Sequence, residues 1–238
     1  MVEPHDVTIH WLDQAESTNA VARDSSYVHG DVVATLNQTA GRGRQGRTWS
    51  MKPGDGVAMT LVVDRDALGN PIQWSRVPLL VATALAGVID TVRPSIKWPN
   101  DLHVDGRKVS GILVEDLGDG RFGIGIGINL WAAPAGLDGT SPTSLAEHGL
   151  DVDVNDLVDR VRGGVLDALR DIDSAATLAR LENAIDTVGR AVLVELPDGR
   201  SMHGVAIGLG ESGALLVEAE GFVTELVAGD VTHLRHAD

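Results

Sequence analysis

Three glycines and three arginines fall within seven consecutive residues, from Gly41 to Arg47, and an indole follows at Trp49. Glycine lets the backbone approach a ligand closely and adopt positive φ, which exposes amide N–H groups. The guanidinium of arginine is a planar fork that suits carboxylates and phosphates. This glycine–arginine segment, GRGRQGRTW, therefore predicts a loop that binds a small anion.

The same segment formally matches the dinucleotide-binding fingerprint, as Gly41-x-Gly43-x-x-Gly46. That fingerprint requires a strand before it and a helix that opens directly after it. Residues 47–56 contain Pro53 and two further glycines, and another strand follows, so we exclude a Rossmann site. A solvated loop that binds nothing is the alternative, because runs of charge usually form solvated faces.

A second group of polar residues stands in the sequence KWPND at residues 97–101. Proline keeps the preceding Trp98 extended, so a strand end would present Lys97, Asn100 and Asp101 at a fixed place. A lysine suits phosphate as a point charge, and a carboxylate suits Mg²⁺. The alternative is a proline turn with an Asn-Asp cap.

Lysine is rare in this chain and concentrates in these motifs. The three lysines are Lys52, Lys97 and Lys108, and the last opens the apparent strand KVSGILVE. Two of three lysines inside motifs, in a chain that otherwise uses arginine, indicate positions that need an ammonium group. We expect Glu115, at the end of this strand, to pair within the sheet and not to catalyse.

Glycine and isoleucine alternate in the run GIGIGIN that ends at Asn129. Glycines on one face of a strand allow another backbone or a flat ligand to approach closely. The amide of Asn129 offers both a donor and an acceptor, as recognition of a purine edge requires.

Strands and helices must position these residues. β-Branched and alternating runs predict strands at residues 7–12, 31–36, 57–64, 95–98, 108–117 and 122–130. Helical periodicity and capping predict helices at residues 20–24, 74–92, 154–172 and 175–188. From Gly189 onward, short strands alternate with tight turns such as Pro197-Asp198-Gly199. We therefore predict an α+β domain at residues 1–188 and a small β-barrel-like domain at residues 189–238.

The composition excludes several classes of protein. The chain contains no cysteine, which rules out disulfides, thiolate metal sites and a cysteine nucleophile. No apolar run approaches the roughly 18 residues of a membrane span, and the N-terminus lacks a basic segment followed by an apolar one. We therefore expect a cytoplasmic protein that binds no membrane.

The formal net charge is −15, from 34 acidic and 19 basic residues. A surface this acidic disfavours non-specific binding to nucleic acid or anionic membranes. Few lysines, many carboxylates and 3% aromatic residues are typical of a protein adapted to high salt, where charge repulsion is screened. The alternative is an ordinary acidic cytosolic protein.

Taken together and in order, the motifs ESTN, QTAGRGRQGRTW, KWPND, KVSGILVE and GIGIN resemble those of the biotin–protein ligases. The motifs cover residues 16–130, and the resemblance continues more weakly to the end of the chain. The family makes biotinyl-5′-AMP from biotin and ATP with Mg²⁺, releases pyrophosphate, and then transfers biotin to one lysine of a biotin carboxyl carrier domain. The resemblance implies a class II synthetase-like catalytic fold, with a mixed sheet flanked by helices, and a small C-terminal SH3-like β-barrel.

The resemblance also implies a role for each motif residue. Biotin would contact Ser17, Thr18, Asn19, Gln38, Arg42, Gly43, Arg44 and Lys108. ATP and the adenylate would contact Gly41, Arg47, Trp49, Asn100 and Asn129. The catalytic residues would be Arg44, Lys97 and Lys108, and Asp101 would hold the metal.

Residue chemistry supports this resemblance. Attack of a carboxylate on an α-phosphate brings two anions together, so catalysis needs positioning and charge neutralisation rather than a protein nucleophile. An acyl-adenylate must also be kept from water, and a glycine-rich loop that orders over it would do so.

Other functions stay open at this point. A lipoate–protein ligase-like enzyme is the nearest rival, although octanoyl transferases of that group use a cysteine that this chain lacks. A nucleic-acid-binding arginine–glycine module would need repeated motifs and a basic face. A non-catalytic biotin-sensing protein would bind biotin without releasing pyrophosphate.

Bifunctional biotin ligases carry a winged-helix segment before the ESTN motif, and only 16 residues precede Ser17 here. We therefore expect no repressor role. The oligomeric state stays open, a homodimer included.

We predict that the stability of the protein depends on salt. If the acidic surface is an adaptation to high salt, the unfolding midpoint rises from low to molar KCl, because screening weakens the repulsion between carboxylates. Thermal unfolding followed across a KCl series measures this. A midpoint that stays flat up to molar salt would contradict it.

Overall fold

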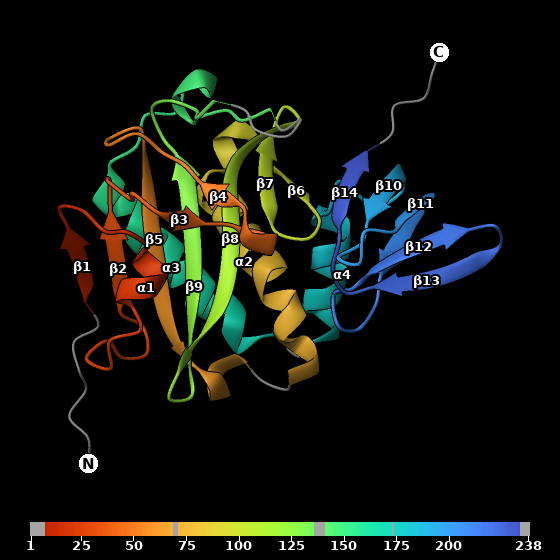
Figure 1. The fold of residues 1–238 in the computed structure, drawn as a ribbon, viewed down its shortest axis with the longest axis horizontal. Helices are drawn as coiled ribbons and strands as arrows, with labels where there is room; N and C mark the ends of the chain where they lie inside the picture. The colour runs from red at the N-terminus through yellow and green to blue at the C-terminus, as the bar shows by residue number, and fades with distance from the viewer. Residues whose placement is uncertain (1–7, 69–70, 136–140, 173, 234–238) are drawn as a thin grey trace.

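A computed structural model describes residues 8–68, 71–135, 141–172 and 174–233 (Figure 1). Its larger sheet has seven strands in the order β1-β2-β5-β9-β8-β7-β6. Their bounds are β1 Ile9–Leu12, β2 Val32–Thr35, β5 Gly56–Asp64, β9 Arg121–Asn129, β8 Arg107–Gly118, β7 Asp101–Val104 and β6 Ser95–Lys97. Strands β1 and β2 are parallel and the other neighbours antiparallel, which confirms the predicted mixed sheet. The sequence did not predict β7, because it is four residues long and follows the proline turn directly.

Helices cover both faces of this sheet. The α-helices are α1 Thr18–Val21, α2 Val77–Val88, α3 Val154–Arg170 and α4 Ala175–Ala184. Short 3-10 turns occur at Arg44–Gly46, Arg65–Leu68, Pro71–Arg76, Asp90–Val92 and Ala146–His148. Helix α1 lies on one face, whereas α2 and α3 pack together on the other (Figure 1). No helix in the described ranges has both the length and the apolar character needed to cross a membrane.

All four helices differ from their predicted bounds. Helix α3 ends at Arg170 instead of residue 172, and α4 ends at Ala184 instead of residue 188 because Ile185 already has an extended backbone. Helix α1 begins at Thr18, earlier than the predicted residue 20, because the extended Ser17 already serves as its N-cap. Helix α2 is shorter than the predicted 74–92, since 3-10 turns replace its first and last parts. Its buried side chains point in several directions because α2 contacts the sheet, α3 and α4.

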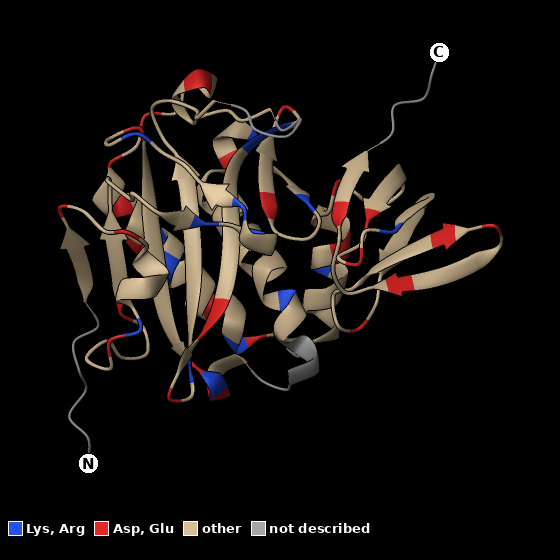
Figure 2. Cartoon of the chain, in the orientation of Figure 1, with Lys and Arg blue, Asp and Glu red and all other residues tan. Residues whose placement is uncertain are grey.

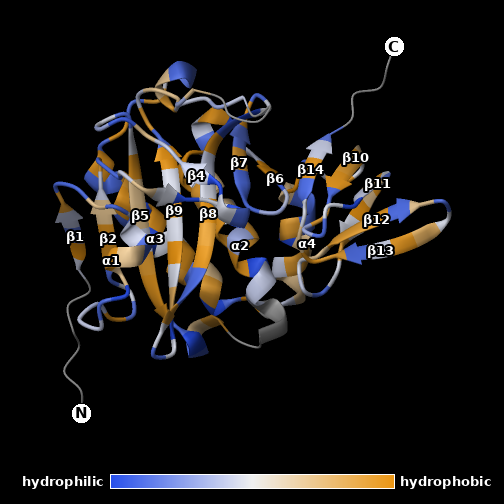
Figure 3. Cartoon of the chain, in the orientation of Figure 1, coloured by the Kyte–Doolittle hydropathy of each residue, from blue (hydrophilic) through white to orange (hydrophobic). Residues whose placement is uncertain are grey.

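The core lies between the large sheet and α2 and α3. Strand β5 is apolar and buried along nearly its whole length, and β8 and β9 add further buried aliphatic side chains (Figure 3). Asp153 caps α3, because its carboxylate accepts the backbone N–H of Asp156 at 3.0 Å. The sheet is thus fixed from behind, and its front face is left for the site.

The second sheet has five antiparallel strands in the order β13-β12-β11-β10-β14. Their bounds are β10 Ala191–Glu195, β11 Ser201–Leu209, β12 Leu215–Ala219, β13 Phe222–Leu226 and β14 Asp230–His233. This sheet is consistent with the predicted SH3-like domain, but within the described residues it is not a closed barrel. The reason is that β14 pairs with β10, while the β12–β13 hairpin projects away from it (Figure 1). The domain boundary near residue 189 stays a prediction.

Trp98 connects the two sheets. Its side chain is buried, and its indole Nε1 donates to the carbonyl of Gly213 at 3.1 Å. Its backbone N–H donates to the hydroxyl of Thr187 at 3.1 Å. The smaller sheet is therefore attached directly to the end of β6.

The glycine–arginine segment forms a hairpin that crosses the front of the large sheet (Figure 1). Its strands are β3 Gly41–Arg42 and β4 Thr48–Trp49. Gly46 in the turn has a φ of 74°, which is the positive φ that the glycines predicted. A strand follows where the dinucleotide fingerprint would need a helix.

Candidate active site

A cavity of about 400 Å³ lies between the β3–β4 hairpin, the start of α1 and the front of strands β8 and β9. All the predicted site residues line it except Gly41 and Lys97. The lining members of that set are Ser17, Thr18, Asn19, Gln38, Arg42, Gly43, Arg44, Arg47, Trp49, Asn100, Asp101, Lys108 and Asn129. Segments more than 100 residues apart thus meet at one place.

One end of the cavity carries neutral polar groups that are buried and hydrogen-bonded. The side-chain oxygen of Gln38 accepts the backbone N–H of Thr18 at 2.9 Å. The hydroxyl of Thr60 donates to Asn19 Oδ1 at 2.7 Å and lies 2.8 Å from the hydroxyl of Thr18. Asn19 Nδ2 in turn donates to Glu115 Oε2 at 2.6 Å. These contacts fix the orientation of each group, since a buried polar network holds its members in one arrangement.

Glycines on the front of β9 bring the hairpin and α1 close to the sheet. A Cβ on Gly127 would lie 2.4 Å from the indole of Trp49, and one on Gly125 would lie 2.7 Å from Asn19 Oδ1. The close approach that the glycine pattern predicted is therefore made by side chains. The indole Nε1 of Trp49 is buried and has no hydrogen-bond partner within the described part of the chain.

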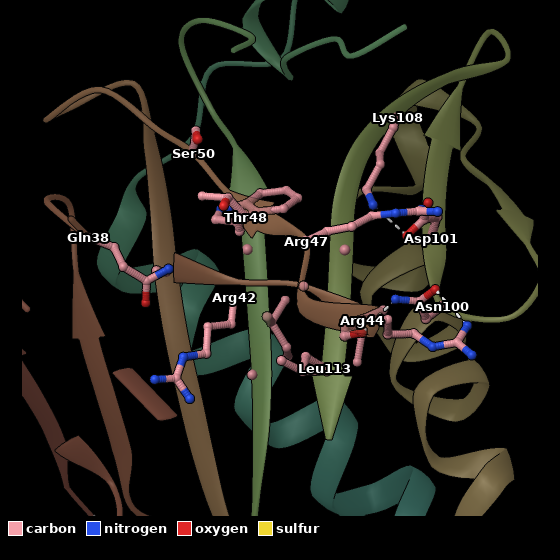
Figure 4. A pocket seen from close by; sticks show the side chains of 18 of the residues that line it. Gln38, Arg42, Arg44, Arg47, Thr48, Ser50, Asn100, Asp101, Lys108 and Leu113 are labelled. Carbon is pink, nitrogen blue, oxygen red and sulfur yellow. Dashed lines mark hydrogen bonds and ion pairs between the residues drawn. The ribbon is translucent and has the colours of Figure 1, made fainter. Parts of the chain in front are cut away.

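The other end of the cavity is cationic. Arg44, Arg47 and Lys108 extend toward Asn100 and Asp101, whereas Arg42 points the other way (Figure 4). Lys108 Nζ lies 2.6 Å from Asp101 Oδ1, and Arg44 Nη1 donates to Asn100 Oδ1 at 3.5 Å. Asp and Glu are spread over both sheets and their loops (Figure 2), and the formal net charge of the chain is −15, so this cationic end is an attractive place for an anion.

Burial and neighbouring charge shift the pKa values at this end. Burial lowers the pKa of the Arg44 guanidinium, and the charge of Asp101 opposes that change. Burial likewise lowers the pKa of Lys97, again opposed by Asp101. Desolvated cations of this kind gain more from an arriving anion than exposed ones do.

Gly41 and Lys97 lie just outside the cavity lining. A Cβ on Gly41 would lie 2.4 Å from Gln38 Nε2 and 2.5 Å from the carbonyl oxygen of Trp49, so only glycine fits there. Lys97 is paired in register with Asp101 across β6 and β7 and faces the same cluster of charges. The structure thus places both beside the site.

Asn129 lines the cavity, but its amide nitrogen serves the backbone. Nδ2 donates to the carbonyl of Thr143 at 2.8 Å and approaches that of Lys108 at 3.5 Å. In this arrangement Asn129 holds the chain after residue 141 against the sheet. Recognition of a purine edge by Asn129 stays a prediction.

Sequence reasoning missed Asp230, which lines the cavity. It also missed two residues beside the lining: Thr60, which bonds to Asn19, and His103, which lies near the charged cluster of Asp101 and Lys108. Burial lowers the pKa of His103 to about 4, with Lys97 and Lys108 adding to the shift and Asp101 opposing it. The imidazole is therefore neutral at pH 7. The signal for it was its position two residues after Asp101 on the same side of a strand, but β7 was not predicted. Asp230 lines the cavity from the second sheet, where nothing in the sequence pointed to the site.

The side chains at the cationic end decide whether a metal ion could bind there. Within the described residues no three His, Asp or Glu side chains gather in a group that could hold one. Asp101 offers one carboxylate and Asn100 one amide oxygen. That set fits Mg²⁺, which commonly binds one or two carboxylates and takes its remaining ligands from water and substrate phosphates.

The chain belongs to the biotin/lipoate A/B protein ligase family, whose model matches residues 11–130. It is similar to the biotin–[acetyl-CoA-carboxylase] ligase of Mycobacterium tuberculosis, at 33% identity over 93% of this chain and 87% of that protein.

Two solved structures agree with this assignment. The biotin protein ligase from Aquifex aeolicus, in complex with biotin and ATP, has a TM-score of 0.80 at 24% identity and covers 96% of this chain and 99% of that one. The biotin protein ligase from Leishmania major, in complex with biotinyl-5-AMP, has a TM-score of 0.68 at 25% identity and covers 93% and 99%. At 24% identity, the likeness to the Aquifex aeolicus structure establishes the fold alone.

We predict that Gly127→Ala destabilises the protein because the new Cβ collides with Trp49. The expected loss in the free energy of unfolding is about 1–3 kcal/mol, as for other overpacked sites. Denaturant unfolding measures it. Gly163→Ala is the matched control, since Gly163 lies in α3 with nothing within 4 Å of the new Cβ and should gain up to about 1 kcal/mol. Equal stability of the two variants would contradict the packing of Trp49 on β9.

Proposed function

We propose that this chain is an ATP-dependent biotin–protein ligase. It activates biotin to biotinyl-5′-AMP with release of pyrophosphate, and then transfers biotin to a lysine of the biotin carboxyl carrier domain of a carboxylase. The observation that carries the proposal is one cavity with neutral polar groups at one end and Arg44, Arg47 and Lys108 at the other. The names of the relatives and the ligands of the solved neighbours support the same activity.

The neutral end suits the ureido group of biotin. Thr18, Asn19 and Gln38 offer hydroxyl and amide groups, which match a neutral group that both donates and accepts hydrogen bonds. The valeryl chain of biotin would run along the apolar floor of the cavity, which includes Ile112 and Leu113. Its carboxylate would then reach the cationic end.

The cationic end suits the first half-reaction. A carboxylate oxygen of biotin attacks the α-phosphorus of ATP, and the bond from that phosphorus to the bridging oxygen breaks, so that pyrophosphate leaves with its electron pair. Both reactants are anions, and Arg44, Arg47 and Lys108 reduce their repulsion. Lys108 would exchange its contact with Asp101 for one with the reacting oxygens. The buried indole N–H of Trp49, which has no hydrogen-bond partner among the described residues, would donate to an acceptor on the nucleotide.

The release of Asp101 by Lys108 would leave its carboxylate for Mg²⁺. The ion would be held by Asp101, with the phosphates of ATP, and would supply further neutralisation of charge on the phosphoryl oxygens. Asn100, which accepts from Arg44 and donates to the carbonyl of Ile112 at 2.8 Å, keeps this part of the chain in place.

The second half-reaction needs protection of the adenylate. The amine of the acceptor lysine attacks the acyl carbon, the bond from that carbon to the phosphate oxygen breaks, and AMP leaves as a proton leaves the amine. Water would compete for the same carbon, so the β3–β4 hairpin acts as a lid that excludes it.

The net charge of −15 supports a protein partner and not nucleic acid, and we place the activity in the cytoplasm, where ATP and carboxylases meet.

The direct test of the function is biotin-dependent exchange between ATP and labelled pyrophosphate. The protein is expected to catalyse exchange with biotin, and Lys108→Ala to lose about 10²–10³-fold of it, because a cation at the reacting oxygens is removed. Lys52→Ala, at the exposed one of the three lysines, serves as control and keeps the activity. Exchange with lipoate but not biotin, or biotin binding without any exchange, would overturn the function.

A separate prediction concerns the lid. Arg44→Ala is expected to release biotinyl-5′-AMP into solution and so to label lysines of unrelated proteins, because the hairpin then lacks its contact with Asn100 and with the intermediate. Streptavidin blotting of a mixture of unrelated proteins measures the labelling. Arg170→Ala, at an exposed position of α3, is the control. Equal adenylate retention in Arg44→Ala and the unmodified protein would argue against a lid.

A further inference from the structure

The active-site cavity receives one acidic side chain from the second sheet. Asp230, the first residue of β14, lines the cavity beside Arg47 of the hairpin. Arg47 Nη1 donates to Asp230 Oδ1 at 3.1 Å, and the other terminal nitrogen of the guanidinium contacts Oδ2. This two-point contact spans 183 residues of sequence and joins the hairpin to the second sheet.

Contacts with Thr187 and with Trp98, at the end of β6, fix the position of Asp230. His233 Nε2, on the same strand, lies 3.0 Å from the hydroxyl of Thr187, and that hydroxyl accepts the backbone N–H of Trp98. A Cβ on Gly229, next to Asp230, would lie 3.8 Å from the indole of Trp98. Strand β14 is therefore held against the KWPND segment, which also carries Asn100 and Asp101.

Arg47 is bound just as closely to the turn of the hairpin. Its backbone carbonyl accepts the N–H of Gly43 at 2.7 Å, and its own N–H donates to the carbonyl of Arg44 at 3.1 Å. A restraint on the side chain of Arg47 therefore restrains the turn that carries Arg44. The hairpin would otherwise rest on the sheet through Trp49 and the long Arg44–Asn100 contact.

We propose that Asp230 is a positioning residue, which acts through Arg47 to hold the glycine–arginine hairpin closed over the cavity. This inference rests on the proposed function, in which that hairpin retains the adenylate. The second sheet thereby contributes to retention of the intermediate. We call the Arg47–Asp230 contact the latch, and the attachment of the second sheet through Trp98 sets its position.

The strength of the latch suits a lid that must also open. The Arg47 side chain is 50% exposed and that of Asp230 31% exposed, so water screens their attraction. Ion pairs with this exposure shift an equilibrium by about two- to fivefold. The latch thus biases the hairpin toward the closed form without preventing entry of ATP or the exit of AMP.

Trypsin reports directly on the hairpin, because it cleaves after arginine and the turn contains Arg44. Cleavage between Arg44 and Gln45 tracks the open population when opening is fast relative to cleavage. In the full-length, ligand-free protein, Asp230→Asn is expected to raise the rate of this cleavage about two- to fivefold. Asp230→Glu keeps the charge and should bring the rate back toward that of the unmodified protein.

The matched control is Asp198→Asn. Asp198 lies in the turn between β10 and β11 of the same sheet and pairs with Arg200 at 2.7 Å, away from the hairpin. It should leave the cleavage rate unchanged. An unchanged rate in Asp230→Asn, or an equal rise in Asp198→Asn, would overturn the latch.

A double-mutant cycle separates the latch from independent effects. Arg47→Gln should raise cleavage at Arg44 as Asp230→Asn does, and the double variant should add nothing further, because both changes remove the same contact. Multiplicative effects would overturn the proposal.

A second readout links the latch to the reaction. Preformed biotinyl-5′-AMP should leave Asp230→Asn about two- to fivefold faster than the unmodified protein in a chase experiment. Failure of pyrophosphate exchange in the unmodified protein would count against the proposed function, while the trypsin result would still decide whether the latch exists. Equal release together with faster cleavage would overturn the role in retention.

Discussion

The site depends on the bare front face of β9. Ile124, Ile126 and Ile128 point into the core, and the glycines between them leave the opposite face without side chains. The indole of Trp49 and the amide of Asn19 occupy the space that those side chains would fill. Two elements from the first 50 residues can therefore lie directly on the sheet, and the cavity is the volume that they enclose with β8 and β9. A side chain at either glycine would push its partner out of the site.

Most of the fold and many of the site residues could be predicted because their signals are local. The strand runs, the hairpin turn and the motif that carries Lys97 and Asp101 each lie within a few adjacent residues. Thr60 could not be predicted, since an isolated threonine in a buried strand gives no sign that it meets Asn19. Asp230 was missed for a related reason: its role depends on how two sheets are placed relative to each other. His103 was missed because the short strand β7, which carries it, was not predicted.

Two of the cations that line the site are paired before any substrate arrives. Asp101 pairs with Lys108, and Asp230 pairs with Arg47, so each carboxylate in the cavity offsets one cation. This matters in a protein that buries several cations together, because unpaired buried charges are strongly destabilising. A substrate with phosphate and carboxylate groups can replace Asp101 as the partner of Lys108, whereas Arg47 keeps its contact with Asp230. These two ion pairs thus stabilise the folded site until an anion binds.

Trp98 shows how one short motif serves both fold and chemistry. Its neighbours Lys97, Asn100 and Asp101 face the cationic end of the site, while its own indole is buried under the second sheet. The second sheet therefore packs directly against the segment that carries Asp101. The small sheet thus contacts the segments that form the site in two ways, through the packed side chain of Trp98 and through the ion pair at Asp230.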